Sequence, residues 1–142
     1  MKAGIKNLGD LTITAALTDY IATSASVNGA ATAYVGDLGG MSKVVAWADF
    51  DYGSSGTTVK AIIQTSLDQG STWIDIICFD FTTSDRKAHA SVGTFAAAAV
   101  TTVAPIASEG KLDNILGDRL RLKVTSTGTY AATSLAVRVH VS

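Results

Sequence analysis

Lys43-Val44-Val45-Ala46-Trp47-Ala48-Asp49-Phe50-Asp51-Tyr52 is the stretch of sequence that decides the fold class. Its even-numbered positions carry apolar side chains: Val44, Ala46, Ala48, Phe50 and Tyr52. Its odd-numbered positions carry a more polar set: Lys43, Val45, Trp47, Asp49 and Asp51. This alternation is typical of a half-buried β-strand. Gly53-Ser54-Ser55-Gly56 follows and predicts a turn.

The same alternation recurs along the chain. It predicts further strands over Thr58–Ser66, Trp73–Phe81, Arg119–Thr125 and Tyr130–Val141. Trp73–Phe81 is apolar on both faces except at Asp75 and Asp80, which predicts a central strand buried from both sides. The last two strands flank a turn at 126–129, and we expect them to form an antiparallel hairpin. Weaker strand candidates are Leu11–Ala16, Ile21–Val27, Ala31–Val35 and Val100–Ala104, and Ser108–Leu116 is expected to form a long crossover loop.

Composition narrows the class further. Hydrophobic residues make up 47% of the 142 residues and the formal net charge is -1, which excludes a disordered chain. The single cysteine excludes a fold built on disulfides. Eleven aspartates against one glutamate indicate few surface helices, because glutamate favours helix surfaces and aspartate favours turns. We therefore expect one all-β domain over 10–142, an antiparallel β-sandwich or jelly roll of about eight to ten strands, preceded by an N-terminal arm at 1–9.

One motif has a defined pattern. Ser66-Leu67-Asp68-Gln69-Gly70-Ser71-Thr72-Trp73 reads S-x-D-x-G-x-T-W and resembles the Asp-box, a β-hairpin motif of sialidases and many unrelated β-proteins. Asp68 is expected to accept hydrogen bonds from the turn, and Gly70 to adopt a positive φ. Ser66 and Thr72 are expected to bond across the hairpin mouth, and the Trp73 ring to close it. The resemblance implies a folding element rather than an active-site carboxylate.

Other candidate groups lack the partners that catalysis needs. Cys78 lies in an apolar strand, far in sequence from His89 and His140, and is interpreted as a small buried hydrophobe. Asp49 and Asp51 share a strand face without a third metal ligand. Five cationic side chains are candidates for a basic sheet face: Arg119, Arg121, Lys123, Arg138 and His140. No P-loop, GxGxxG, CxxC or HExxH pattern is present, so we expect no enzyme activity, cofactor or metal.

Three segments together are similar to small β-sandwich structural proteins of tailed bacteriophages and phage-like particles. They are Val59–Asp68, the box continuing through Thr72–Ile76, and Gly117–Tyr130. The resemblance implies a non-enzymatic virion protein of the capsid decoration (cement) type, made in the host cytoplasm and placed on the capsid surface. It implies the major capsid protein as partner, a homo-oligomer, expected to be a trimer, and no nucleic-acid or membrane partner.

Two sets of contact residues follow from these expectations. The interface candidates for capsid binding are Ile5, Leu8, Leu11, Val45 and Trp47. The alternative is a carbohydrate- or receptor-binding sandwich of a phage tail, fibre or head spike. In that case Trp47 and Tyr52 would stack on a glycan while Asp49 and Asp51 accept its hydroxyls.

Overall fold

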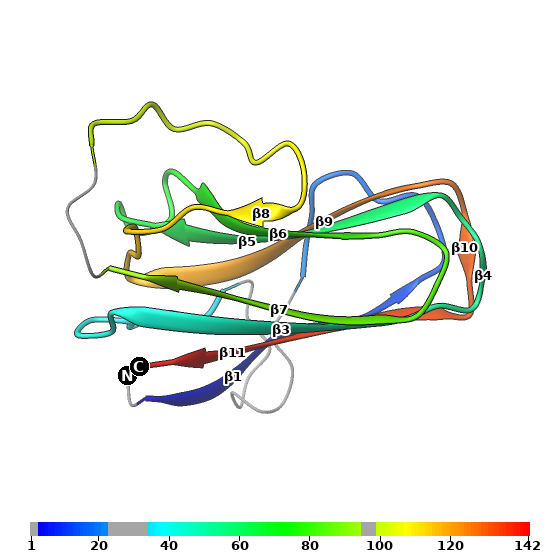
Figure 1. Cartoon of the computed structure of the whole chain (residues 1–142), viewed down its shortest axis with the longest axis horizontal. Coiled ribbons are helices and arrows are strands. Elements are labelled where there is room, and N and C mark those ends of the chain that lie inside the picture. Colours follow the sequence, from blue (N-terminus) through cyan, green and yellow to red (C-terminus); the bar gives the residue numbers. More distant parts are fainter. Residues whose placement is uncertain (1–2, 23–33, 95–98) are drawn as a thin grey trace.

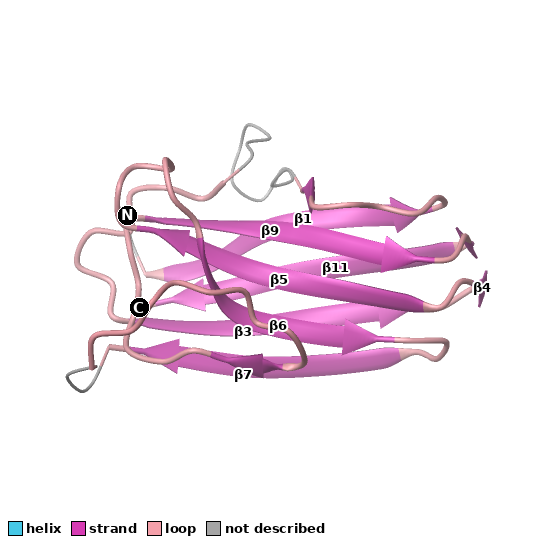
Figure 2. Ribbon diagram, turned by 90° about the horizontal axis from the view of Figure 1, so that it is seen from above, coloured by secondary structure: helices cyan, strands magenta, loops and turns pink. Residues whose placement is uncertain are grey.

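The computed structural model describes residues 3–22, 34–94 and 99–142. Two antiparallel sheets pack face to face, which confirms the predicted all-β sandwich (Figure 1). Seen from above, the long strands of both layers run along the same axis of the molecule (Figure 2). This is the aligned arrangement of sheet packing, in which the inward side chains of the two layers fill one shared core.

The described residues form two main sheets and one small ribbon. The four-stranded sheet has the order β1 (Gly4–Ile13), β11 (Thr133–Val141), β3 (Lys43–Asp51), β7 (Arg86–Gly93). The five-stranded sheet has the order β2 (Tyr20–Ile21), β9 (Arg119–Thr127), β5 (Thr58–Ser66), β6 (Ile74–Phe81), β8 (Gly110–Lys111). The ribbon pairs β4 (Ser54–Ser55) with β10 (Tyr130–Ala131).

The core forms because alternate residues of each long strand face the opposite layer. In β3 these are Val44, Ala46, Ala48 and Phe50, all fully buried as the alternation predicts. Phe50 stacks on Phe81 of the other sheet with ring centroids 4.8 Å apart. Burying a side chain of this size contributes roughly 1.5–3 kcal/mol to folding, so the aromatic contact joins the two layers strongly.

Strand β6 is buried on both faces, as its sequence predicts. One face meets the four-stranded sheet across the core, and all its residues except Asp80 are buried. The chain from 99 to 116, which we call the covering loop, passes over the other face of β6, where Ile106 N–H donates to Asp75 Oδ2 at 3.1 Å, and its β8 segment pairs with the edge of β6 (Figure 1). A loop that covers a sheet face in this way creates a third layer at one end of the sandwich.

The predicted hairpin between the last two long strands is wrong. Strand β9 pairs with β2 and β5, whereas β11 pairs with β1 and β3 in the other sheet. The connection crosses the end of the sandwich through Gly128 and Ala132, both at positive φ. Both strands alternate with the same period, and this pattern fits two strands facing each other across a core as well as it fits a hairpin.

The predicted N-terminal arm also differs from the structure. Residues 4–9 belong to β1, which pairs with β11 from Gly4 opposite Val141 to Ile13 opposite Thr133. A bulge between Asn7 and Gly9 shifts the register. Leu8 lies at this bulge and is buried in the core. The segment is therefore an edge strand of the sandwich rather than a separate arm.

The weaker strand candidates meet mixed outcomes. The strand predicted over Leu11–Ala16 begins seven residues earlier in the structure, because β1 covers Gly4–Ile13. Of the candidate at 21–27, Ile21 lies in β2, which covers only Tyr20–Ile21. Of the candidate at 31–35, Val35 forms an isolated β-bridge with Leu120. The rest of the candidates at 21–27 and 31–35 lies outside the described residues, apart from Ala22 and Tyr34, neither of which is a strand residue. Val100–Ala104 forms no strand, whereas Ser108–Leu116 is a loop apart from β8.

Candidate functional site

The Asp-box turn between β5 and β6 is held by its own side chains. Ser66 Oγ donates to Asp68 Oδ1 at 2.9 Å, and Thr72 N–H donates to the same oxygen at 2.7 Å. Gly70 N–H donates to Ser66 Oγ at 2.8 Å, and Gly70 has a φ of 93°. The hydrogen bond from the Thr72 backbone is the main reason that the pKa of Asp68 lies below its usual value. Asp68 Oδ1 and Ser66 Oγ thus both accept hydrogen bonds from within the turn, as expected of a motif that stabilises the fold.

A row of stacked rings and guanidinium groups lies beside this turn. The Arg121 guanidinium sits over the Trp73 ring at 4.1 Å, and the Arg119 guanidinium sits over the Tyr34 ring at 4.6 Å. The two rings are 6.4 Å apart and tilted by 47°. Each cation–π contact contributes about 0.5–1 kcal/mol at an exposed site. The row ties the Asp-box to strand β9 and to Tyr34.

A buried polar network continues from this row across the outer face of the five-stranded sheet. Arg121 Nε donates to Gln64 Oε1 at 2.8 Å, and Gln64 Nε2 donates to Asp75 Oδ1 at 2.6 Å. The second oxygen of Asp75 accepts from the backbone N–H of Ile106 at 3.1 Å. The network therefore links strand β9 to the covering loop. Sequence reasoning missed it because its members are far apart in the chain.

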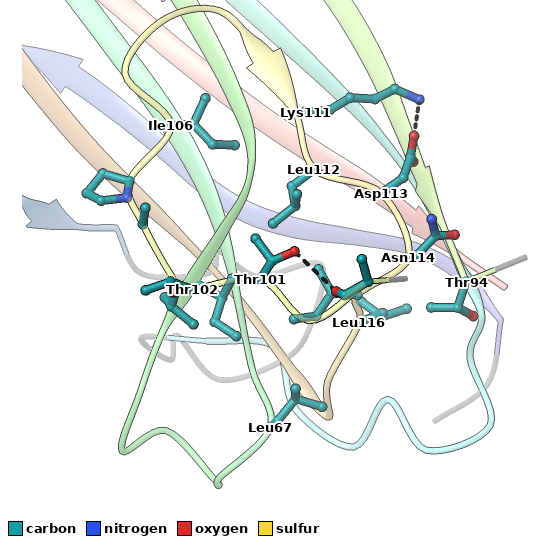
Figure 3. A pocket seen from close by; sticks show the side chains of 16 residues that line it. Leu67, Thr94, Thr101, Thr102, Ile106, Lys111, Leu112, Asp113, Asn114 and Leu116 are labelled. Atoms are coloured by element: carbon teal, nitrogen blue, oxygen red, sulfur yellow. Dashed lines mark hydrogen bonds and ion pairs between the residues drawn. The ribbon is translucent and has the colours of Figure 1, made fainter. Parts of the chain in front are cut away.

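A cavity of about 570 Å³ lies between the covering loop and the Asp-box end of the sheet. Ile106 and Leu112 lie between the two arms of the loop, and Leu67 of the Asp-box closes one side (Figure 3). The only ion pair at its wall joins Lys111 Nζ to Asp113 Oδ2 at 3.0 Å, among the residues that the structure describes. Its walls are mostly aliphatic, which suits an uncharged apolar group.

The predicted interface residues do not all reach the surface. Ile5 and Trp47 are exposed on the outer face of the four-stranded sheet, and Val45 is half-buried there. Ile5 and Val45 both pair with His140, from either side of β11, and Trp47 pairs with Arg138. Leu8 is fully buried and Leu11 packs partly against the core. The interface prediction is therefore wrong for Leu8, because the bulge in β1 places it inside.

The predicted basic face is divided between the two layers. Arg119, Arg121 and Lys123 lie on β9, whereas Arg138 and His140 lie on β11 of the other sheet. Arg138 also donates to Asp10 Oδ1 at 2.9 Å, and the pKa of Asp10 is lowered by hydrogen bonds from Asn7 and Arg138 that outweigh its burial. The five side chains are therefore divided between two surfaces, and Arg119, Lys123 and Arg138 each form an ion pair within the chain.

The carboxylates and the second aromatic of the glycan hypothesis are also separated. Asp49 and Asp51 remain on the outer face of β3, where Lys87 Nζ lies 3.5 Å from Asp49 Oδ2. Tyr52 turns the other way, stacks near Phe50 and donates its hydroxyl to the carbonyl of Ser55 at 3.0 Å. Trp47 and Tyr52 thus do not form one platform.

Cys78 is buried in β6, and burial together with Asp80 raises the pKa of its thiol to about 12. A thiol that stays protonated is a poor nucleophile. Among the described residues no group of three or more His, Cys, Asp or Glu side chains is placed to hold a metal ion. The part of the chain that the structure describes also contains no helix long and apolar enough to cross a membrane.

Three features thus stand out on the described surface: the Asp-box row, the aliphatic cavity, and the outer face of the four-stranded sheet with Ile5, Val45 and Trp47. The first is fully used in holding the fold, and the other two present apolar groups to solvent. Neither a family model, nor a curated protein, nor a solved structure matches the chain.

Proposed function

We propose that this chain is a non-enzymatic virion protein that decorates a phage capsid. The observation that carries the proposal is the outer face of the four-stranded sheet, where Ile5 of β1 and Val45 of β3 flank His140 of β11 and Trp47 lies two residues along β3 from Val45. Apolar side chains gathered on a flat sheet face are suited to bury against another protein. The proposed partner is the major capsid protein, and the protein acts on the capsid surface after synthesis in the host cytoplasm.

The proposed mechanism is binding energy rather than chemistry. A protein that binds assembled capsid subunits but not dissociated ones stabilises the shell by mass action. Trp47 is the expected anchor because a large aromatic side chain with an exposed ring dominates the energy of many interfaces. Arg138, which lies opposite Trp47 on β11, is already paired with Asp10 within the chain.

The test mixes the purified protein with expanded, undecorated heads of the encoding phage. We expect saturable binding, a higher melting temperature of the heads, and at least about tenfold weaker binding by Trp47→Ala, since a hot-spot residue contributes 2 kcal/mol or more. Tyr20→Ala is the matched control, because it removes an exposed aromatic from the other sheet. Absence of binding to the heads would refute the proposal. We also propose that the protein is a trimer, and light scattering of the free protein tests this separately.

Glycan binding on a tail, fibre or head spike is the second candidate function. It is favoured because Trp47 and Asp49 lie two residues apart in β3 and therefore project from the same outer face of the sheet. One exposed ring with nearby carboxylates is a minimal sugar site. Binding to glycans on an array that disappears in Trp47→Ala, with no binding to heads, would favour this function over decoration.

A further inference from the structure

Strand β7 pairs with β3 along one side only and forms a border of the four-stranded sheet (Figure 2). Just beyond β7, Thr94 N–H donates to the carbonyl of Ser42 at 2.9 Å. Hydrogen bonding alternates along an antiparallel pair, so the even-numbered residues of β7 bond to β3 in the same way. The odd-numbered residues therefore point their backbone N–H and C=O groups away from the sheet.

Two contacts limit the stretch of β7 that is open to a partner. At one end, the carbonyl of Gly93 accepts from Asn114 N–H at 2.9 Å, as expected of an odd-numbered residue. At the other end, the Arg86 guanidinium binds Glu109 of the covering loop. Residues 87–91 between them form what we call the open edge. No hydrogen bond within the described part of the chain satisfies its three outward-pointing backbone positions, which are those of Lys87, His89 and Ser91.

The other borders of the two sheets are protected against strand addition. Strands β2 and β8 contain only two residues each. Strand β1 is long, but a bulge between Asn7 and Gly9 interrupts its register, and the ion pair of Arg138 with Asp10 lies beside the bulge. Short strands, bulges and charges are the devices that keep sheet edges from pairing. The open edge pairs with β3 in continuous register and carries no proline, so β7 is the unprotected border among the described strands.

The open edge is complementary to itself. A strand edge is completed by another strand edge, and the long, regular one that the described chain offers is the same edge of a second copy. A two-fold axis through His89 places His89 opposite its own counterpart and Lys87 opposite Ser91 of the second copy. This register uses all three outward-pointing residues and forms about six backbone hydrogen bonds. It also keeps the two Lys87 side chains apart, and each remains beside Asp49 of its own chain, 3.5 Å away.

The core side of the open edge fits the same register. Ala88 and Ala90 face the opposite layer, yet both stay half-buried. With Phe79 they line a groove of about 140 Å³ at this border of the sandwich. In the two-fold register Ala88 lies opposite Ala90 of the second copy, so small side chains meet on the core side and the strands can approach to normal sheet spacing.

We infer that the open edge of β7 pairs with the same edge of a second copy about a two-fold axis, which joins two four-stranded sheets into one continuous sheet. His89 lies opposite Trp47 across the pair of β7 with β3. The contact therefore aligns Trp47 and His89 of one copy with His89 and Trp47 of the other in a single row on one outer face. This inference goes beyond the proposed function and does not depend on it, because the free protein forms the contact.

Cysteine substitutions test the register. In a hydrogen-bonded antiparallel pair the two Cα atoms lie about 5.5 Å apart, which suits a disulfide. With oxidised glutathione as the oxidant, His89→Cys should give a covalent dimer on a non-reducing gel. Lys87→Cys and Ser91→Cys should give one only when the two variants are mixed. The thiol of Cys78 is buried and should not interfere. Absence of a crosslink in His89→Cys, or an equal crosslink in Lys87→Cys alone, would overturn the inference.

Light scattering over a range of concentrations measures the association itself. We expect a dimer, or a hexamer where the proposed trimer also forms, with dissociation of the β7 contact in the micromolar range because one strand per copy is a small interface. His89→Lys sets like charges opposite each other, and Ser91→Pro removes an outward-pointing N–H from each copy. Each should weaken the association by at least about tenfold. Thr12→Lys adds the same charge at the bulged border of the sheet and is the matched control.

Circular dichroism melting verifies that each variant is folded. A monomer or a trimer at the highest concentration of the wild type would overturn the inference, and so would an even-numbered oligomer that His89→Lys leaves intact. Binding of the wild type to phage heads is measured separately. Its failure would refute the proposed function and leave the β7 contact standing, whereas loss of the crosslink with head binding retained would do the reverse.

Discussion

Glu109 accepts hydrogen bonds from both terminal nitrogens of the Arg86 guanidinium, with Arg86 Nη2 lying 2.8 Å from Oε1. Glu109 is the one glutamate in the sequence, and it joins the covering loop to β7 of the four-stranded sheet. It also exchanges backbone contacts with Asp80 of β6: Asp80 N–H donates to its carboxylate at 3.0 Å, and Glu109 N–H donates to the Asp80 carboxylate at 3.2 Å. One side chain therefore closes the edge of the sandwich where β6 and β7 meet.

Replacing Glu109 by Gln should destabilise the protein by about 1 kcal/mol at pH 7. The pair is about two-fifths exposed on both sides, so solvent screening keeps its contribution in the range of surface ion pairs. Urea unfolding followed by tryptophan fluorescence measures the difference. Asp113→Asn is the matched control, because it breaks an equally exposed ion pair in the same loop without joining the two sheets. Its effect should stay below about 0.5 kcal/mol.

The effect of Glu109→Gln should depend on pH in a defined direction. The hydrogen bond from Arg86 holds the pKa of Glu109 below its ordinary value in the folded protein. A carboxylate with a lowered folded pKa stabilises the protein above its unfolded pKa and loses that contribution as the pH falls through the folded pKa. The difference in stability between the wild type and the variant should therefore begin to shrink as the pH falls below the ordinary glutamate pKa of about 4.3, and it should vanish below the lower folded pKa. A difference that persists in acid would contradict the assigned ion pair.

Removal of the Asp68 carboxylate should loosen the Asp-box. Asp68→Ala leaves the Thr72 N–H and the Ser66 hydroxyl without their shared acceptor, so the urea midpoint should fall with an unchanged slope. Ser71→Ala changes an exposed residue of the same turn and should stay within about 0.5 kcal/mol of the wild type. Head binding should be retained by folded Asp68→Ala. Equal stability of the two variants would show that the carboxylate does not hold the turn.

The parts of the fold that sequence predicts are those with strong local signals. Strand β3 alternates apolar residues, among them Val44 and Phe50, with a more polar set, and its predicted start at Lys43 is the observed one. Strand β7 was missed because its inward positions carry Ala88 and Ala90, whose small side chains give a weak period. The partner of β11 was mispredicted because inward alternation does not say which layer a strand joins.

The functional surfaces were less predictable than the strands. The Asp-box depends on residues within one turn, and its pattern is legible in the sequence. The cavity depends on a loop without period, and its walls come from segments as distant as Leu67 and Leu116. The stacking of Arg119 on Tyr34 likewise joins residues 85 positions apart. Contacts of this kind follow from the tertiary fold, which the local pattern does not encode.

Cys78 should resist alkylation in the folded protein. Its side chain is 1% exposed, and burial with the nearby Asp80 raises the thiol pKa to about 12. At pH 8 the thiolate fraction is then at least about a hundredfold below that of an unperturbed cysteine. Iodoacetamide labelling followed by mass spectrometry should modify the chain only after unfolding in urea. Rapid labelling of the native protein would contradict the buried placement.

Gly117 should tolerate no larger residue. Its N–H donates to Thr65 Oγ1 at 2.8 Å, and a Cβ at this position would run into the backbone carbonyl of Ser66. Because a strand backbone cannot move without shifting the Asp-box, Gly117→Ala should destabilise the protein by about 2–3 kcal/mol or more. Gly39→Ala is the matched control, since a Cβ there has open space and the backbone is not in the left-handed region. The control should be neutral or stabilise by up to about 1 kcal/mol through the lower entropy of the unfolded chain. Thermal melts that rank the two variants the other way would contradict the close approach of Gly117 to the Asp-box strand.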